Sequence, residues 1–156
     1  MDSKFKVVEY QPEHQSVFER LNKAWLEEYF TVEPLDKWVL ENPQEAILDD
    51  KGCILFVEYQ GVLIGTVALK FIEPGLYEMT KMAVNKKFQG IGAGIFICKA
   101  AIKQGQNLKA KKLILYSQTS LAPAISIYRK LGFKEIPLEK GKYERANIKM
   151  EIIYKN

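Results

Sequence analysis

Several segments of the chain either alternate apolar and polar residues, as 5–10 does, or form short apolar runs, as 113–116 does, and both patterns are typical of β-strands. These segments are 5–10, 53–59, 62–72, 77–84, 113–116, 133–138 and 143–154. Gln60-Gly61 and Pro74-Gly75 stand between consecutive segments, as turn residues do in hairpins. The pattern therefore predicts seven strands, three of which follow one another in the middle of the chain.

Apolar residues spaced three and four positions apart predict helices between these strands. The expected helices are 12–29, a broken or short one within 30–43, one from the bend at 85–94 to Gly105, and one that ends at Gly132. Thr119 or Ser120 can cap the last of these helices, and Gly132 can adopt the left-handed conformation that terminates it. The order of elements predicts one α/β domain that spans residues 1–156.

Hydrophobic residues make up 47% of the chain and charged residues 27%, which is typical of a soluble globular protein. No apolar run is long enough to cross a bilayer, and the first ten residues lack the apolar core of a secretory signal. We therefore expect a cytoplasmic protein.

Charge is divided unevenly between the two halves of the chain. Residues 1–78 hold 7 Lys and Arg against 15 Asp and Glu, whereas residues 79–156 hold 16 against 4. The two halves could simply attract each other, or the acidic half could receive a cation and the basic half an anion. The lysines are scattered through apolar segments, with no zinc spacing and no RNA-binding aromatic motif, so we expect no nucleic-acid partner.

Three glycines open the third predicted helix, in the segment NKKFQGIGAG at 85–94. The first N–H groups of a helix have no internal partner, and the helix dipole favours an anion beside them. Glycines would let a pyrophosphate approach this backbone, and each glycine otherwise costs about 1 kcal/mol relative to alanine in a helix. The segment predicts a phosphate site, with close packing of the backbone as the alternative.

Two familiar phosphate motifs do not fit. A Walker loop requires Gly-Lys-Ser or Gly-Lys-Thr, which is absent. The dinucleotide motif requires G-x-G-x-x-G near the start of a βαβ unit and an acid on the next strand, but the spacing here is G-x-G-x-G and 113–116 contains no acid.

The segment KFQGIG at 87–92 instead resembles motif A of the GNAT acetyltransferases, Q/R-x-x-G-x-G/A, with Lys87 at the first position. The segment AISIYRKLGF at 124–133 resembles their motif B, A-x-x-x-Y-x-K-x-G-F. The two matches lie about thirty residues apart with a strand between them, as in that family. The resemblance is close over about 77–133.

The resemblance implies a GNAT fold: a mixed, mostly antiparallel sheet of six or seven strands flanked by about four helices. Two parallel strands, 77–84 and 113–116, would splay apart and hold acetyl-CoA between them. The family often has Asn early in motif B where this chain has Leu121. The residues implied to bind the cofactor are Met82, Ala83, Val84, Lys87, Gln89, Gly90, Ile91, Gly92, Ala93, Gly94, Ser120 and Arg129.

Two residues are implied to be catalytic. Tyr128, the tyrosine of motif B, would protonate the departing CoA thiolate, because a phenol is still protonated at neutral pH. Glu78 would accept a proton from the amine if an apolar environment raised its pKa. The alternatives are that Tyr128 is only a core residue and that a water chain replaces Glu78.

The acceptor would lie between the N-terminal helices and the last hairpin. Tyr29, Phe30, Glu33 and Tyr143 are the expected contacts, with Trp38, Arg145 and Asn147 nearby. Aromatic and acidic side chains suit an ammonium group, so the sequence predicts an N-acetyltransferase that acts on a primary amine and requires no metal. A polyamine, amino sugar, amino acid or peptide acceptor, a homodimer, and a non-catalytic acyl-CoA sensor of the same fold all stay open.

Overall fold

A computed structural model describes residues 4–30, 32–139 and 145–155. Its seven strands form one sheet in the order β1-β2-β3-β4-β5-β7-β6, in which only β4 and β5 run parallel. The strands are β1 Phe5–Glu9, β2 Cys53–Tyr59, β3 Val62–Glu73, β4 Leu76–Val84, β5 Lys112–Ser117, β6 Lys134–Ile136 and β7 Ile148–Ile153. The helices are η1 Pro12–His14, α1 Gln15–Tyr29, α2 Pro34–Glu41, η2 Gln44–Leu48, η3 Lys86–Phe88, α3 Ala93–Asn107 and α4 Ala122–Lys130.

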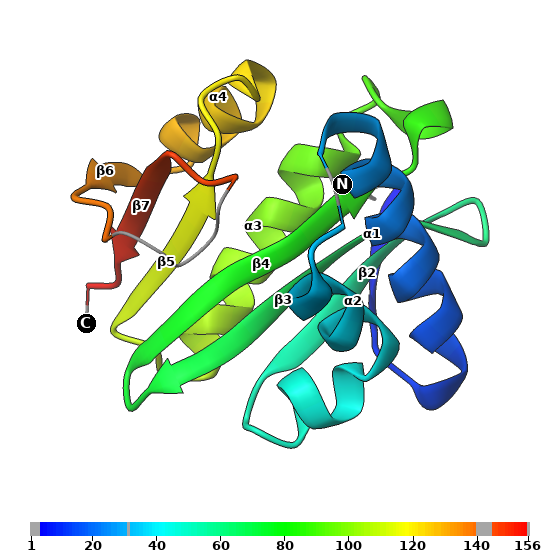
Figure 1. Ribbon diagram of the computed structural model, residues 1–156, viewed down its shortest axis with the longest axis horizontal. Coiled ribbons are helices and arrows are strands. Elements are labelled where there is room, and N and C mark those ends of the chain that lie inside the picture. Colours follow the sequence, from blue (N-terminus) through cyan, green and yellow to red (C-terminus); the bar gives the residue numbers. More distant parts are fainter. Residues whose placement is uncertain (1–3, 31, 140–144, 156) are drawn as a thin grey trace.

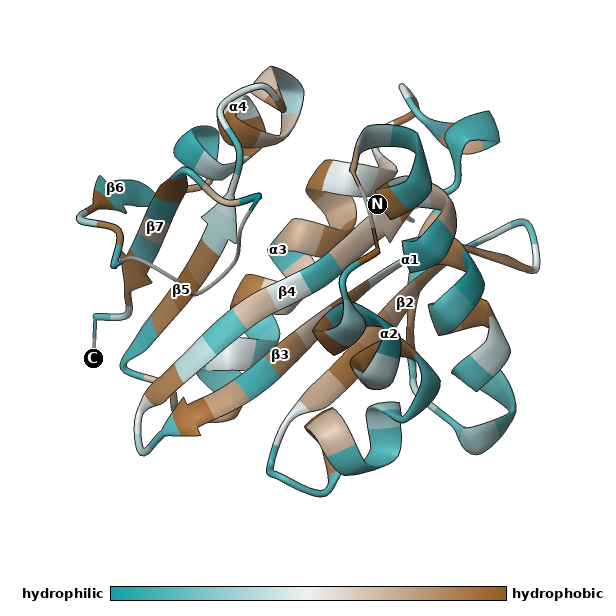
Figure 2. Cartoon of the chain, viewed as in Figure 1, coloured by the Kyte–Doolittle hydropathy of each residue, from teal (hydrophilic) through white to brown (hydrophobic). Residues whose placement is uncertain are grey.

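Helices cover both faces of the sheet, with α1 and α2 in front and α3 behind in Figure 1. Two apolar clusters result. The larger joins the sheet to α3 and α4, and the smaller joins it to α1, α2 and η2. In Figure 2 the helices carry both brown and teal segments, as expected where amphipathic helices bury one stripe against a sheet. The predicted fold class is confirmed.

The two parallel strands separate after a short paired stretch. Pairing between β4 and β5 begins at Leu76 and Lys112 and includes no pair beyond Glu78 and Ile114. From there the strands diverge, as Figure 1 shows from the lower left upward. The later residues of both strands therefore have no strand partner across this gap.

A β-bulge changes the direction of the side chains on β4. Thr80 pairs with Ala68 of β3 but Ala83 pairs with Thr66, so two residues of β4 oppose one of β3. Lys81 within this bulge has φ 55°, a left-handed conformation. Strand alternation had predicted that Glu78, Thr80, Met82 and Val84 share one face. This is wrong, because the extra residue moves Met82 and Val84 to the opposite face.

Several elements differ from the prediction in type or in length. The five residues of η2 form a π-helix that the pattern did not indicate. The final hairpin is shorter than predicted on both strands, and Pro137, which has no N–H to donate, follows the last residue of β6.

Neither Thr119 nor Ser120 caps α4, whose N-cap is Leu121. Thr119 is engaged elsewhere, since its N–H donates to Asn147 Oδ1 and its hydroxyl accepts from Asn147 Nδ2. The predicted C-terminus is confirmed: Gly132 has φ 108°, and the Phe133 N–H donates to the Tyr128 carbonyl. Within the described ranges, no helix has the length and apolar character needed to cross a membrane.

Candidate active site

The gap between β4 and β5 holds a cavity of about 860 Å³. Residues of α1 line it on one face of the sheet, and residues of α3 and α4 line it on the other. The cavity therefore extends through the gap from face to face. We call the end next to α1 and α2 the acceptor end, and the end next to α3 and α4 the cofactor end.

The glycine bend forms the wall of the cofactor end. Gly90 and Gly92 have φ 85° and 96°, and Gly92 is the N-cap of α3. A methyl group on Gly90 would meet nothing within 4 Å, so the backbone at this point faces open space. The first amides of the fifteen-residue helix α3 begin here without intrahelical partners. This arrangement fits a phosphate group. The left-handed backbone at Gly90 and Gly92 is a second reason for glycine at these two positions, whether or not a ligand binds.

Tyr128 lies on α4, where its side chain lines the cofactor end while its ring packs 5.9 Å from that of Phe133. The residue is 8% exposed, and burial raises the pKa of its hydroxyl. The hydroxyl is therefore protonated at neutral pH, as a proton donor must be. Tyr128 therefore packs in the apolar core and also lines the cavity.

Glu78 is the last residue of β4 that pairs with β5, so it lies where the two strands part. It is 1% exposed and lines the cavity, on the face of the sheet that α1 and α2 cover. Tyr116 of β5 also lines the cavity, and its hydroxyl donates to Glu139 at 2.5 Å. Burial, the bond to Glu139 and the charges of Glu139 and Glu78 all raise the pKa of Tyr116.

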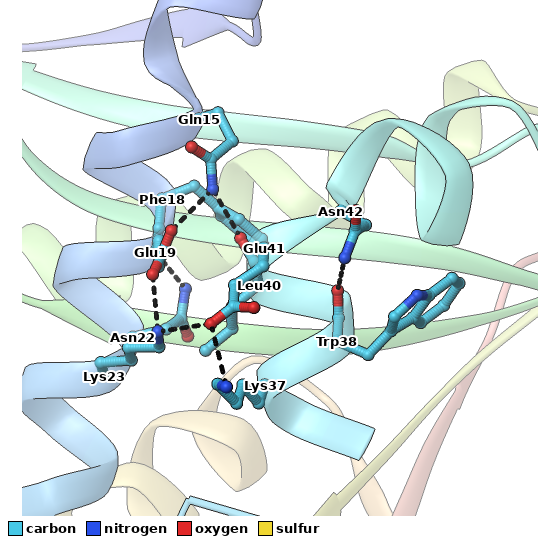
Figure 3. Close-up of polar contacts among 10 residues, drawn as sticks. All are labelled: Gln15, Phe18, Glu19, Asn22, Lys23, Lys37, Trp38, Leu40, Glu41 and Asn42. Carbon is cyan, nitrogen blue, oxygen red and sulfur yellow. Dashed lines mark hydrogen bonds and ion pairs between the residues drawn. The ribbon is translucent and has the colours of Figure 1, made fainter. Parts of the chain in front are cut away.

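Helix α2 is fastened to α1 beside the acceptor end (Figure 3). The Gln15 side chain donates to the Leu40 carbonyl at 2.9 Å. The Lys23 ammonium bridges Glu19 at 2.6 Å and Glu41 at 3.0 Å, which connects the two helices. These contacts hold α2 in place and so fix the position of the acid that it directs toward the sheet.

That acid is Asp36, which is 1% exposed. Its Oδ1 accepts from Lys81 Nζ at 2.7 Å and from an Arg145 nitrogen at 3.0 Å, and its Oδ2 accepts from the other Arg145 nitrogen at 2.7 Å. Glu33 also accepts a hydrogen bond from Arg145. Burial raises the pKa of Asp36, but the bonds and charges of Arg145 and Lys81 outweigh it and lower the pKa overall. The cluster of Glu33, Asp36, Lys81 and Arg145 therefore joins α2, β4 and the segment before β7.

Comparison with known proteins agrees with this geometry. A family model described as the acetyltransferase (GNAT) family matches residues 15–133. The chain belongs to the GNAT acetyltransferase family. An uncharacterised N-acetyltransferase of Schizosaccharomyces pombe is 27% identical over 128 residues, which cover 79% of this chain and 78% of that protein.

Solved structures show the same GNAT fold. An acetyltransferase of the GNAT family from Staphylococcus aureus has a TM-score of 0.85 and 18% identity, with 97% of this chain and 99% of the other covered. A Salmonella typhimurium protein, solved with its cofactor acetyl-CoA, has a TM-score of 0.78 and 15% identity, with 99% and 96% covered.

Most of the residues predicted to bind the cofactor line the cavity of this GNAT protein, but three do not. Lys87 and Ile91 are not among the described lining residues, and Arg129 instead pairs with Glu135 at 3.7 Å. Those that line it are Met82, Ala83, Val84, Gln89, Gly90, Gly92, Ala93, Gly94 and Ser120. Their roles in binding remain predictions.

The acceptor residues are divided in the same way. Tyr29 and Phe30 line the cavity. Glu33 is not among the described lining residues and instead forms an ion pair with Arg145, which does line it. Tyr143 lies outside the described residues. Sequence reasoning missed the cluster around Asp36. The available signal was Lys81, a charged residue inside an otherwise largely apolar strand.

Proposed function

We propose that the protein is an N-acetyltransferase that moves the acetyl group of acetyl-CoA to a primary amine of a small molecule or peptide. The observation that carries this proposal is one continuous cavity that passes through the gap in the sheet. One end has the glycine-rich N-terminus of α3, and the other end has the buried carboxylate of Glu78. Such a cavity suits two reactants that enter from opposite faces and meet in the gap.

The N–H groups at the start of α3 would hold the pyrophosphate of the cofactor, because they and the helix dipole favour an anion there. The unpaired edge of β4 at Met82, Ala83 and Val84 would bind the pantetheine arm through backbone groups. When bound, acetyl-CoA supplies a thioester whose carbonyl carbon can be attacked by an amine.

The side chains of the gap would move the protons. An amine with a pKa near 10 is mostly protonated at neutral pH, and only the free base can attack. Glu78 would accept the proton of the incoming amine at the acceptor end. As the C–N bond forms and the C–S bond breaks, Tyr128 would donate its proton to the sulfur at the cofactor end, and the proton that the acylated nitrogen loses would restore the Tyr128 hydroxyl through solvent.

Two measurements test the proposal. At 100 times its Kd, acetyl-CoA should stabilise the native state by about 2.7 kcal/mol and raise the thermal midpoint, whereas ATP and NAD should do much less. Release of the CoA thiol should then depend on an added amine in a screen of amines. Equal stabilisation by ATP would contradict the cofactor assignment. Binding of acetyl-CoA without thiol release to any amine would instead identify an acyl-CoA sensor.

A further inference from the structure

The charged residues at the acceptor end are not those expected for a simple ammonium site. The charged residues that line the cavity in the described parts of the chain are Glu78, Lys81, Lys130 and Arg145. Lys130 lies on α4, at the cofactor end. Among the described residues, the acceptor end therefore combines one carboxyl group, that of Glu78, with two cations.

The acids that balance these cations lie behind them. Asp36 and Glu33 accept the hydrogen bonds of Lys81 and Arg145, but neither is among the described residues that line the cavity. The cations are thus held between the acids and the cavity. A ligand in the cavity meets the positive side of this cluster.

The fold places Lys81 here by means of the bulge. Regular alternation would direct residue 81 to the face opposite that of Thr80. The left-handed turn at Lys81 brings its side chain, 6% exposed, to Asp36 on α2 instead. A non-glycine residue in this conformation costs about 1 kcal/mol or more, and such strain gathers at functional sites.

Charges of both signs act on Lys81. Burial lowers the pKa of its ammonium and the charge of Arg145 lowers it further, while Asp36 and Glu78 act in the opposite direction. Lys81 and Arg145 both line the cavity, so a ligand carboxylate there would lie next to two cationic hydrogen-bond donors. A second ammonium, as in a polyamine, would be repelled at the same place.

We propose that the acceptor carries a carboxylate beside its amine, with Lys81 and Arg145 holding the carboxylate while Glu78 receives the amine. This inference rests on the proposed function and names the substrate class as amino acids or closely similar small molecules. Glu78 and Lys81 lie three residues apart on β4, and the charge of Glu78 acts on Lys81. Neighbouring side chains can therefore contact the amine and the carboxylate of one small molecule. Asp36 is a positioning residue, because it orients both cations without lining the cavity.

The test compares matched acceptors at saturating acetyl-CoA: amino acids, their carboxamides, the amines that lack the carboxyl group, and a polyamine. We expect kcat/KM for the best amino acid to exceed that of its carboxamide by about tenfold or more, as for the loss of a charged hydrogen bond. Calorimetric binding of the same pairs to the protein without acetyl-CoA should show the same preference.

Variants assign the preference to its residues. Lys81→Met should abolish most of the acid-over-amide ratio. If Lys81→Met proves unstable, Arg145→Lys can be used instead, because it keeps a cation beside Asp36. It should also reduce the acid-over-amide ratio. Lys37→Met is the matched control, since Lys37 is an exposed lysine on α2 and outside the described cavity lining. It should leave the ratio unchanged.

The outcomes separate this inference from the proposed function. Faster acetylation of carboxamides or polyamines than of any amino acid would overturn the inference and leave the N-acetyltransferase standing. An unchanged ratio in folded Lys81→Met and Arg145→Lys would also overturn it. If acetyl-CoA binds and no amine is acetylated, both the function and the inference fail.

Discussion

Two buried side chains, Tyr128 and Glu78, stand on opposite faces of the gap between β4 and β5. Removal of a proton from the amine and addition of a proton to the leaving sulfur would take place on opposite sides of the acetyl group. If Glu78 is the base and Tyr128 the acid, each residue lies on the side of the gap where its proton transfer would take place. Their substitution should give different pH profiles.

Replacing Tyr128 with Phe keeps the ring that packs on Phe133 and removes only the hydroxyl. We expect CoA binding to be nearly unchanged and kcat to fall about 10²-fold, the usual size of a lost general acid. Because burial raises the pKa of Tyr128, the hydroxyl stays protonated through pH 9.5, so the deficit should be constant up to that pH. Loss of CoA affinity and stability at an unchanged rate per bound complex would mean that Tyr128 is only a core residue.

Glu78→Gln should behave differently as pH rises. A larger fraction of the amine is already free at pH 9.5 than at pH 7, so a missing base matters less. The rate deficit of the variant should shrink over that interval when steady-state rates are compared with the wild type. Wild-type rates at every pH would assign the base to water or to another group.

At the scale of elements, the start of α3 is where we expect the pyrophosphate of the cofactor to bind. Gly92→Val would be an ambiguous test, because the left-handed backbone at Gly92 strains any other residue. Gly94 is the better position, since it lies inside α3 and an added methyl group would meet only Ile127, at 3.7 Å.

Gly94→Ala should therefore keep or raise the thermal midpoint, because alanine is favoured over glycine in a helix by about 1 kcal/mol. It should at the same time weaken CoA binding in a calorimetric titration, because the methyl group narrows the cavity between α3 and α4. Gly92→Ala serves as the comparison, with a lower midpoint from backbone strain. An unchanged CoA affinity in folded Gly94→Ala would argue against a backbone cradle for the cofactor.

The cluster that joins α2 to β4 makes a prediction about stability. Asp36→Asn would leave the buried Lys81 and the half-buried Arg145 with less negative charge, and breaking a buried ion pair such as Lys81–Asp36 costs about 3 kcal/mol or more. The folded-state pKa of Asp36 lies below its ordinary 3.8, so its contribution is complete above that pH and is lost as pH falls further. Urea unfolding should show a large difference from wild type at pH 7 and a smaller one below pH 4. Equal stabilities at pH 7 would mean that the cluster does not support the fold.

Much of the element order could be predicted from the sequence, because hydrophobic periods and glycine positions are local signals. The start of α3 and the C-terminus of α4 were predicted for this reason. The bulge at Lys81 could not be predicted, since it depends on how β4 pairs with β3. The N-cap of α4 could not be predicted either, because Thr119 binds Asn147 from 28 residues away instead of capping the helix. Long-range contacts of this kind leave no periodic pattern.

For the whole molecule, the unequal charges of the two halves have a structural consequence. The acidic first half supplies α1 and α2, which cover the acceptor end, and the basic second half supplies α3 and α4 at the cofactor end (Figure 1). The sequence led us to expect that acids near the acceptor would receive an ammonium group. In the structure Asp36 and Glu33 bind Arg145, and this pairing underlies our proposal that the acceptor carries a carboxylate beside its amine.

Hydrogen–deuterium exchange with and without acetyl-CoA tests the central claim most directly, namely that the cofactor lies in the gap against the start of α3. Amides without backbone hydrogen-bond partners exchange fast, so those of 90–95 and those on the edge of Met82–Val84 that faces the gap report local contact. At a concentration of acetyl-CoA that raises the thermal midpoint, we predict slower exchange in these two segments, with β1 and β2 little changed. Unchanged exchange in both segments at that concentration, or equal protection by ATP, would contradict the account.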